Sequence, residues 1–286
     1  MSIFCCHFAN MMRTNFETTL NYQKIKLIVT DLDGTLLNDE KQVPAEFREL
    51  EKRFRQENIN WVLASGRQYY TIADQFSEIL NDVYIIAENG AITMKGSELI
   101  HLNPLDKELT NELIIRGRGI DNAWPILCGK NSAWIENGHD DLLDEIRKYY
   151  SKLQIVDDLT LVDDVTLKFT MCDFLGSEVN SLSYYNDMQH RCRVAIGGKI
   201  FLDITSSTAT KGTALQEIMK HSNAASEEVM AFGDYLNDLE MLEVAGISYA
   251  MKNSHPDLFR SARYVTKHHN NDNGVIREIK EYFKLT

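Results

Sequence analysis

Cysteine is scarce in this chain, and its few cysteines show no pattern that would let them share a bond or a metal. They number five among 286 residues, and none belongs to a Cys-x-x-Cys pair. A disulfide framework or a zinc site requires paired, suitably spaced cysteines. We therefore expect free thiols in a reducing compartment, and so a cytoplasmic protein. The residues concerned are Cys5, Cys6, Cys128, Cys172 and Cys192.

Positive charge is also under-represented. Lysine and arginine number 30 against 42 aspartates and glutamates, which gives a formal net charge of −12. Proteins that bind nucleic acids or anionic membranes neutralise phosphate groups with an extended basic surface, so this balance argues against both kinds of partner. A phosphorylated substrate would need a strongly cationic local site, such as Mg2+ together with a lysine.

Long apolar runs are missing as well, so no membrane-spanning segment is predicted. The mildly apolar stretch 3–12 precedes the nearby basic residue Arg13, whereas a signal peptide has the reverse order. We interpret residues 1–24 as a loosely held N-terminal extension, or as the product of an upstream start codon with Met11 or Met12 as later starts. The sequence also contains no internal repeat, no Gly-x-Gly-x-x-Gly motif and no Walker A loop.

Strand and helix patterns alternate at the two ends of the chain. The predicted strands lie at residues 25–30, 60–64, 83–87, 228–232, 246–250 and 264–265. The predicted helices lie at residues 44–57, 68–80, 211–221, 236–245, 256–262 and 275–283. This alternation predicts a parallel sheet with right-handed crossovers.

The middle of the chain has a different pattern, with antiparallel pairs between helices. Hairpins or strand pairs are predicted at 92–102, 124–136 and 193–205, a single strand at 166–172, and helices at 104–117, 140–150 and 178–189. Such a mixture indicates a separate α+β module. The sequence thus predicts an α/β protein in which residues 25–87 and 206–286 form one unit and residues 88–205 form an inserted one.

Two aspartates and a serine follow the first two predicted strands. Asp31 and Asp33 come directly after the first strand, and Ser65 follows the second, at the mouth of a helix. Ligands gather at the carboxyl ends of strands in an open α/β sheet, and a helix N-terminus favours an anion. Residues two apart on an extended chain point the same way, so we expect the two carboxylates side by side with a cation or a shared proton between them.

Further polar residues occur at equivalent places near the C-terminus. Lys211 is predicted in the first turn of a helix, where its charge opposes the helix dipole unless the ammonium faces an anion. Asp234 follows a strand, with Asn237 and Asp238 shortly after it. Each residue alone is readily explained as a helix cap, a turn residue or a solvated surface group. Their joint placement at successive sheet edges is what favours a functional site.

Six short motifs carry a resemblance to a known family. They are DLDGTLL (31–37), LASGR (63–67), ENGA (88–91), TKGTAL (210–215), FGDYLNDLEML (232–242) and MKN (251–253). With these motifs in this order, the sequence resembles the haloacid dehalogenase (HAD) superfamily of phosphohydrolases, within it the Cof-type group with a type IIB cap. The resemblance implies a Rossmann-like parallel-sheet core into which residues 88–205 are inserted as the α+β cap domain.

The resemblance also implies an activity. The protein would be a phosphoric monoester hydrolase, a Mg2+-dependent phosphatase for small phosphorylated metabolites such as a sugar phosphate or a cofactor phosphate. Asp31 would be the nucleophile that forms an aspartyl-phosphate. Asp33 would protonate the leaving alcohol and then take a proton from the attacking water.

The implied Mg2+ would be held by oxygen ligands, as this hard cation prefers. They are the side chain of Asp31, the backbone carbonyl of Asp33 and the side chain of Asp234, with Asp238 in support. Phosphate contacts are implied for Ser65 and Lys211, and Asn237 would orient Lys211 or the phosphate. Arg67 and Asn89 match family positions near the cap boundary, where structural roles are at least as well supported.

Other functions are compatible with parts of this pattern. A phosphomutase or phosphotransferase uses the same first half-reaction but keeps water out. A receiver-like phospho-acceptor regulatory domain also combines an aspartate with a serine or threonine and a lysine, but it has no need of Asp33 or of a large inserted module. A catalytically silent binding protein would not require the full set of residues. The sequence indicates neither an oligomeric state nor which cap residues contact the substrate.

Overall fold

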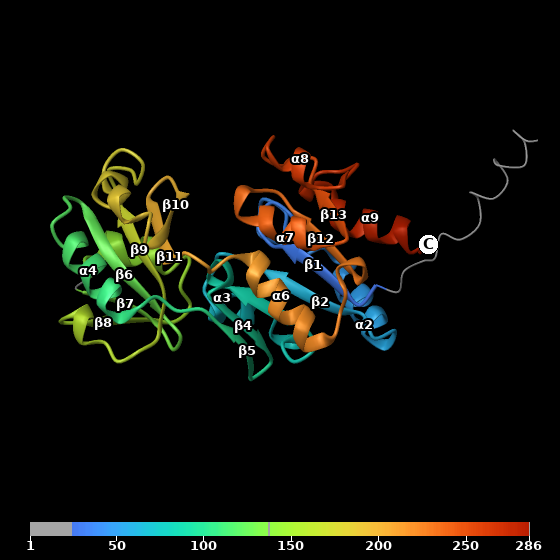
Figure 1. The fold of residues 1–286 in the computed structure, drawn as a ribbon, viewed down its shortest axis with the longest axis horizontal. Helices are drawn as coiled ribbons and strands as arrows, with labels where there is room; N and C mark the ends of the chain where they lie inside the picture. The colour runs from blue at the N-terminus through green and yellow to red at the C-terminus, as the bar shows by residue number, and fades with distance from the viewer. Residues whose placement is uncertain (1–24, 137, 286) are drawn as a thin grey trace, which may run out of the picture.

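The computed structural model describes residues 25–136 and 138–285, which form two bodies side by side, each built on a β-sheet (Figure 1). The extension expected at residues 1–24 lies outside the described residues, as do Cys5 and Cys6. In the described part, Cys128, Cys172 and Cys192 are buried free thiols. None of the described helices combines the length and the apolar character needed to cross a membrane.

The larger sheet has eight strands in the order β14-β13-β12-β1-β2-β3-β4-β5. Its parallel strands are β1 (Leu27–Asp31), β2 (Asn60–Ala64), β3 (Tyr84–Ala87), β12 (Val229–Gly233), β13 (Ile247–Ala250) and β14 (Tyr264–Val265). An antiparallel hairpin, β4 (Ile92–Lys95) and β5 (Glu98–Leu102), completes the edge beside β3. The predicted α/β class with a parallel-sheet core is thereby confirmed.

Helices cover both faces of this sheet. They are α2 (Phe47–Gln56), α3 (Tyr69–Gln75), α6 (Lys211–Ser222), α7 (Leu239–Val244), α8 (Leu258–Ser261) and α9 (Gly274–Tyr282). Successive side chains of β1 point to opposite faces of the sheet: Ile28 packs in one hydrophobic cluster, and Leu27 and Val29 pack in another. Helices are therefore needed on both faces. The first cluster includes α2 and α9, and the second includes α6 and α7. A strand buried on both faces is typical of a parallel sheet.

The smaller sheet has six strands in the order β10-β11-β9-β6-β7-β8. They are β6 (Ala123–Gly129), β7 (Ala133–Glu136), β8 (Leu153–Val156), β9 (Thr166–Asp173), β10 (Cys192–Gly198) and β11 (Phe201–Ser206), accompanied by α4 (Lys107–Gly117) and α5 (Asp140–Ile146). Strand β8, which the sequence did not predict, pairs in parallel with β7. Its four residues are half-buried or exposed, so its apolar pattern is weak.

Two parts of the predicted insertion differ from the structure. The hairpin 92–102 pairs with β3 in the larger sheet, so the insertion begins after Leu102 and not at residue 88. The reason is a tight turn over Glu88–Gly90, which reverses the chain at once and returns β4 alongside β3. The predicted helix 178–189 is also wrong, because two short 3-10 helices, Ser181–Tyr184 and Asn186–Met188, occupy this segment.

The failure of that helix has a local cause. The Asp173 carboxylate accepts hydrogen bonds from the Ser181 backbone N–H at 2.9 Å and from the Asn180 side chain at 3.1 Å. Side-chain acceptors of this kind compete with helical backbone hydrogen bonding. The segment is therefore folded around Asp173 and does not form a regular helix.

The chain passes between the two bodies twice, after β5 and after β11. The two crossings are tied together, because Asn103 Nδ2 donates to Thr208 Oγ1 at 3.0 Å. The helix α6 begins directly after the second crossing, and so the first residue of α6 is placed by the junction between the bodies.

Candidate active site

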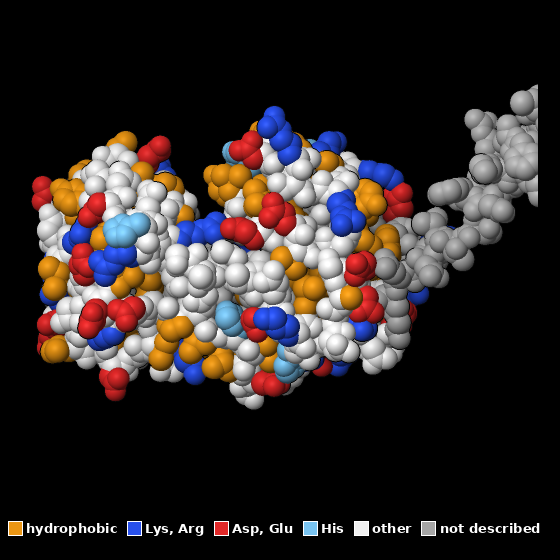
Figure 2. All heavy atoms as spheres, viewed as in Figure 1, with side chains coloured by type: hydrophobic (Ala, Val, Ile, Leu, Met, Phe, Trp, Pro, Cys, Tyr) orange, Lys and Arg blue, Asp and Glu red, His pale blue; other side chains and the backbone are white. Residues whose placement is uncertain are grey.

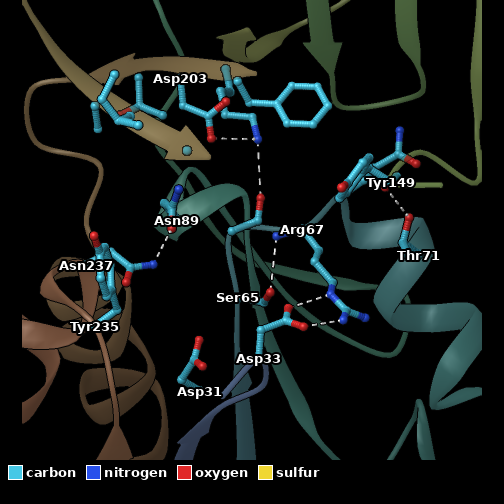
Figure 3. A pocket seen from close by; sticks show the side chains of 18 of the residues that line it. Asp31, Asp33, Ser65, Arg67, Thr71, Asn89, Tyr149, Asp203, Tyr235 and Asn237 are labelled. Carbon is cyan, nitrogen blue, oxygen red and sulfur yellow. Dashed lines mark hydrogen bonds and ion pairs between the residues drawn. The ribbon is translucent and has the colours of Figure 1, made fainter. Parts of the chain in front are cut away.

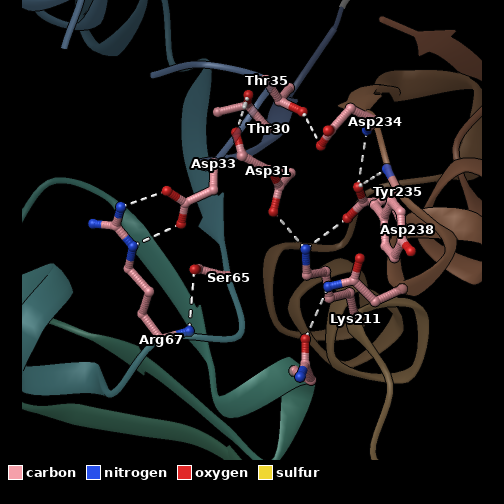
Figure 4. A network of polar contacts seen from close by, with 12 residues as sticks. Thr30, Asp31, Asp33, Thr35, Ser65, Arg67, Lys211, Asp234, Tyr235 and Asp238 are labelled. Carbon is pink, nitrogen blue, oxygen red and sulfur yellow. Dashed lines mark hydrogen bonds and ion pairs between the residues drawn. The ribbon is translucent and has the colours of Figure 1, made fainter. Parts of the chain in front are cut away.

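Lys211 lies at the centre of a buried polar cluster (Figure 4). It is the first residue of α6, and its side chain is fully buried. The Lys211 ammonium Nζ lies 2.5 Å from Asp31 Oδ1, at the end of β1, and 2.6 Å from Asp238 Oδ1. The start of α6 is fixed by a capping box in which Thr210 Oγ1 accepts from the Thr213 N–H at 3.0 Å. The lysine predicted to oppose the helix dipole thus faces two carboxylates.

Asp234 lies beside this cluster because β12 pairs with β1. Thr35 Oγ1 donates a hydrogen bond to Asp234 Oδ1 at 3.0 Å. The second oxygen of Asp238, Oδ2, accepts from the backbone N–H groups of Asp234 at 3.0 Å and Tyr235 at 3.2 Å. These bonds fix the turn that follows β12 and hold Asp234 and Asp238 against each other.

The three carboxylates are arranged so that they could hold a metal ion. One oxygen from each of Asp31, Asp234 and Asp238 lies within 4.8 Å of the others. An all-oxygen set of this kind suits a hard divalent cation. Gly34, at φ +80°, leaves the room that the cluster needs, since a β-carbon there would collide with the Asp234 carboxylate. The donor set and the space both fit a cation.

Burial and mutual repulsion perturb the charges of the cluster. Burial raises the pKa of Asp31 well above its usual range; Lys211 opposes this rise, and Asp238 and Asp234 add to it. Burial and the charge of Asp238 likewise raise the pKa of Asp234 to about 6. Burial alone would lower the pKa of Lys211, but Asp238 and Asp31 outweigh it and raise the pKa above its usual range. The raised pKa keeps Lys211 protonated at neutral pH, and a metal ion would relieve the repulsion that remains among the three carboxylates.

The prediction that the carboxylates of Asp31 and Asp33 lie side by side is wrong. Strand β1 ends at Asp31, so the alternation that would align the two side chains stops before Asp33. Instead Asp33 forms a two-pronged ion pair with Arg67, at 2.7 Å to Nε and 2.5 Å to Nη2, and a further pair with Lys41 at 2.8 Å. Burial raises the pKa of Asp33, but the bonds and charges of Arg67 and Lys41 outweigh it and lower the pKa overall. Asp33 is therefore an anion here, and its side chain points away from the Asp31 cluster (Figure 4).

Ser65 and Asn237 lie on two sides of the same site. Ser65 follows β2 and is buried, and its Oγ accepts from the Arg67 N–H at 3.1 Å. Asn237 donates from Nδ2 to Asn89 Oδ1 at 3.0 Å, in the turn after β3. Of the two roles predicted for Asn237, orienting Lys211 has no matching contact among the hydrogen bonds of the described residues, and orienting the phosphate stays a prediction.

A cavity of about 1370 Å³ lies between the two bodies and opens onto these residues. Figure 2 shows the notch between the bodies, with lysine and arginine side chains at its base. The larger body contributes Asp31, Asp33, Ser65, Arg67, Asp234 and Asn237 to the lining, and the smaller body contributes Tyr149, Lys168, Arg193, Phe201, Asp203 and Thr205. The residues predicted to act in catalysis therefore line one side of the cavity, and residues of the insertion line the other side (Figure 3).

Sequence reasoning missed Lys41, and for Arg67 it gave a family position near the cap boundary, with a structural role at least as well supported, but no contact with Asp33. The Arg67–Asp33 pair joins residues 34 apart in sequence, and the loop that carries Lys41 has no periodic pattern to place it. The Ser-Gly-Arg run after the second strand was the one available signal for Arg67. The cavity-facing residues of the insertion had no sequence signal, because the pairing of β9 with β11 determines which of them converge.

Comparison with known proteins gives one consistent result. A family described as haloacid dehalogenase-like hydrolase matches residues 28–279. An Escherichia coli protein named 5-amino-6-(5-phospho-D-ribitylamino)uracil phosphatase is 30% identical over 91% of this chain and 97% of its own length. A Bacillus subtilis protein of the same name is 26% identical over 91% of this chain and 98% of its own length. The solved structure of a HAD subclass IIB sugar phosphatase superposes with a TM-score of 0.76, at 22% identity over 91% of this chain and all of that one, which shows a shared fold.

Proposed function

Because this chain belongs to the haloacid dehalogenase-like hydrolases and is a phosphatase of that family, we propose that it hydrolyses small phosphorylated metabolites with Mg2+, through an aspartyl-phosphate. One observation carries this proposal: Asp31, Asp234 and Asp238 converge around the buried Lys211 at the edge of the cavity. The convergence supplies a nucleophile, a cation site and a fixed positive charge in one place.

Asp31 is the nucleophile in this proposal. Its free carboxylate oxygen attacks phosphorus, and the bond from phosphorus to the leaving-group oxygen breaks. Lys211 holds the other side of Asp31 and offsets the negative charge of the approaching phosphoryl group, while Ser65 binds a phosphoryl oxygen. Mg2+, held by the side chains of Asp31 and Asp234 and the Asp33 backbone carbonyl with Asp238 in support, supplies charge neutralisation when bound.

Asp33 handles the proton. It gives a proton to the leaving oxygen, and in the second half-reaction it takes one from the water that attacks the aspartyl-phosphate. In this structure Arg67 and Lys41 keep the Asp33 carboxylate anionic, so Asp33 has to part from Arg67 and take up a proton from water before it can act as the acid. Asn237, held at the rim of the cavity by its hydrogen bond to Asn89, orients the phosphate group.

The insertion, residues 103–206 by sheet pairing, acts as the cap that encloses the leaving group. A cavity of about 1370 Å³ is ample for a metabolite, since ligand pockets usually measure about 300–1000 Å³.

The first substrate to test is 5-amino-6-(5-phospho-D-ribitylamino)uracil, by analogy with the relatives. Sugar phosphates come next, given the fold neighbour. A cytoplasmic location stays a prediction.

The proposal is tested by replacing the nucleophile. We expect Asp31→Asn to lower kcat for p-nitrophenyl phosphate by a factor of about 10⁴ or more, because the amide cannot form the acyl phosphate. A suitable control is Asp163→Asn, which makes the same charge change on an exposed cap residue and should behave as wild type. EDTA should silence the wild-type enzyme, and added Mg2+ should restore it. Turnover by Asp31→Asn within tenfold of wild type, about 1.4 kcal/mol, would refute the nucleophile assignment.

The same assay separates the alternatives. A phosphatase releases free phosphate from p-nitrophenyl phosphate in every turnover. A phosphomutase or phosphotransferase would pass the phosphoryl group to an acceptor other than water, and a receiver-like domain would accumulate stable phospho-protein. Measurement of free phosphate alongside nitrophenol, with intact-mass analysis of the protein, distinguishes the three.

A further inference from the structure

One strand of the cap presents alternate residues to the cavity. Along β11, Phe201, Asp203 and Thr205 line the cavity, while Leu202 and Ile204 are buried in a hydrophobic cluster on the other face of the sheet. Among the described cap residues that line the cavity, Asp203 is the one acidic side chain. The reaction as described above does not use it.

The Asp203 carboxylate is held in a fixed orientation. Thr170, its register partner on β9, donates from Oγ1 to Asp203 Oδ1 at 2.7 Å. Lys168 Nζ lies 3.4 Å from Asp203 Oδ2. Lys168 is itself anchored to the larger body by a 2.8 Å ion pair with Glu88 and a 3.3 Å bond to the Gly66 carbonyl. Asp203 is therefore positioned before any substrate arrives.

Small neighbours leave the same carboxylate open on its cavity side. Ala195 is its register partner on β10, and a β-carbon at Gly197 would lie 2.9 Å from Asp203 Oδ2. The side chain remains 14% exposed. An ionised carboxylate offers about four lone-pair sites, and Thr170 and Lys168 use two of them. The remaining acceptor capacity faces the cavity, where it calls for a hydrogen-bond donor.

The surroundings define the kind of donor. Asp203 lies across the cavity from Asp31, on the side where the leaving group has to sit (Figure 3). Its neighbour Phe201 packs edge-to-face against Tyr149, with ring centroids 4.9 Å apart, and both line the cavity. This part of the cavity combines an anionic acceptor with an aromatic wall, which suits an uncharged leaving group bearing hydroxyl or N–H groups on a carbon skeleton.

We propose that Asp203 determines specificity by accepting hydrogen bonds from hydroxyl or N–H groups of the leaving group, so that the substrates are phosphate monoesters of polyols and similar donor-rich molecules. This inference rests on the proposed phosphatase function. A site built around a buried acceptor discriminates strongly against analogues that lack the donor, because the acceptor is then left unpaired.

The test compares two substrates that differ in donors alone, D-ribitol 5-phosphate and n-pentyl phosphate. We expect wild type to prefer the polyol ester in kcat/KM by about 10- to 100-fold, the range for one hydrogen bond to a charged group. In Asp203→Asn this ratio should fall to within about threefold of unity. The control Asp163→Asn, with the same charge change outside the cavity, should keep the wild-type ratio.

A second variant separates recognition from a purely structural role. If Asp203 served only as a counter-ion for Lys168, Asp203→Glu would keep that role and the substrate ratio would stay at the wild-type value. In the recognition role the displaced carboxylate does not restore the ratio, although thermal stability recovers relative to Asp203→Asn. Equal loss on both substrates in Asp203→Asn would overturn the proposal.

Hydrolysis of p-nitrophenyl phosphate by wild type distinguishes failure of the specificity role of Asp203 from failure of the proposed phosphatase function. If the aryl ester is hydrolysed and wild type shows no preference for the polyol ester, or turns over neither alkyl ester, the specificity role of Asp203 is refuted while the phosphatase function stands. If wild type hydrolyses none of the three esters with Mg2+ present, the phosphatase function fails and the specificity role fails with it.

Discussion

Asp234 links the charge of the site to pH. Its pKa is raised to about 6 by burial and by Asp238, so without a metal the carboxyl binds a proton more tightly in the folded protein than in the unfolded chain. Its contribution to stability is therefore complete below its usual pKa of 3.8 and is lost as the pH rises through about 6. A metal ion has to displace that proton before it can bind.

We accordingly expect Mg2+ to bind more weakly in acid. The apparent Kd should rise as the pH falls from about 8 to about 5, most steeply below about 6, because proton and metal compete for Asp234. Isothermal titration calorimetry at several pH values measures this directly. A Kd that stays constant across the range would contradict the role assigned to this carboxylate.

Gly34 provides a second test at the level of single residues. It adopts φ +80°, and a β-carbon there would collide with the Asp234 carboxylate. Gly34→Ala should cost about 1–2 kcal/mol in the free energy of unfolding and lower kcat/KM by about 100-fold, because both the backbone and the carboxylate are displaced. Chemical denaturation and steady-state kinetics measure the two effects.

The matched control for that substitution is Gly119→Ala. A β-carbon there meets only the Arg116 carbonyl, at an ordinary 3.7 Å, so stability should change by less than about 0.5 kcal/mol and activity should be unchanged. Similar behaviour of the two alanine variants would mean that the space at Gly34 is not needed by the metal site.

Residue-scale prediction from the sequence succeeded where a strand fixed the position and failed where the strand had ended. Asp31 is the last residue of β1 and Asp234 comes directly after β12, which pairs with β1, so the approach of the two carboxylates could be expected from the order of elements. Asp33 lies two residues past Asp31, in a turn, and its partners Arg67 and Lys41 come from other loops. Backbone alternation carries no information about contacts of that kind.

At the scale of elements, the position of Lys211 depends on how the N-terminus of α6 is capped. Thr210 caps the helix that carries Lys211, so Thr210→Ala should cost about 1 kcal/mol in the free energy of unfolding and lower kcat/KM by about tenfold. Thr210→Ser, which keeps the hydroxyl, should restore both. Denaturation midpoints and kinetics report the two quantities separately.

A cap remote from the site serves as the comparison. Asp106 caps α4 in the insertion, where its carboxylate accepts from the Glu108 and Leu109 N–H groups at 2.9 and 3.1 Å. Asp106→Ala should cost a similar free energy of unfolding and leave turnover unchanged. If the two variants lost activity equally, the loss would reflect general destabilisation and not the placement of Lys211.

The sequence predicted elements best where one periodicity held throughout. Strand β2 was predicted at its observed bounds, and the family resemblance correctly placed the chain among the HAD-like hydrolases. The allocation of β4 and β5 to a sheet was beyond reach, because a hairpin has the same alternation whichever neighbour it pairs with. The segment 178–189 has helical spacing, but the bonds of Asp173 prevail over it.

At the scale of the whole molecule, the two bodies have largely separate cores. Two hydrophobic clusters consist of residues 105–204, and the other two belong to the larger body apart from Leu167. Several contacts between the bodies are polar, such as the paired bonds of Gln68 with Lys152 and the ion pair of Arg193 with Glu240. Polar contacts across a cleft couple two cores weakly.

We therefore expect two thermal transitions. Differential scanning calorimetry should give a calorimetric enthalpy larger than the van't Hoff enthalpy, because the cores unfold separately. Mg2+ at about 100 times its Kd should stabilise one transition, that of the larger body, by about 2.7 kcal/mol. A single two-state transition that shifts as a whole would show instead that the bodies unfold as one unit.

The paired crossings, fastened by Asn103 and Thr208, have a mechanical consequence. One flexible link can swivel in every direction, whereas two links clasped side by side confine a moving lobe to rotation about a single axis. Such rotation requires release of the polar contacts that join the bodies, among them the ion pair of Lys168 with Glu88, and would then change the distance from Asp203 to Asp31 while the start of α6 stays still. Asn103 and Thr208 would then align the two walls of the cavity without taking part in the reaction.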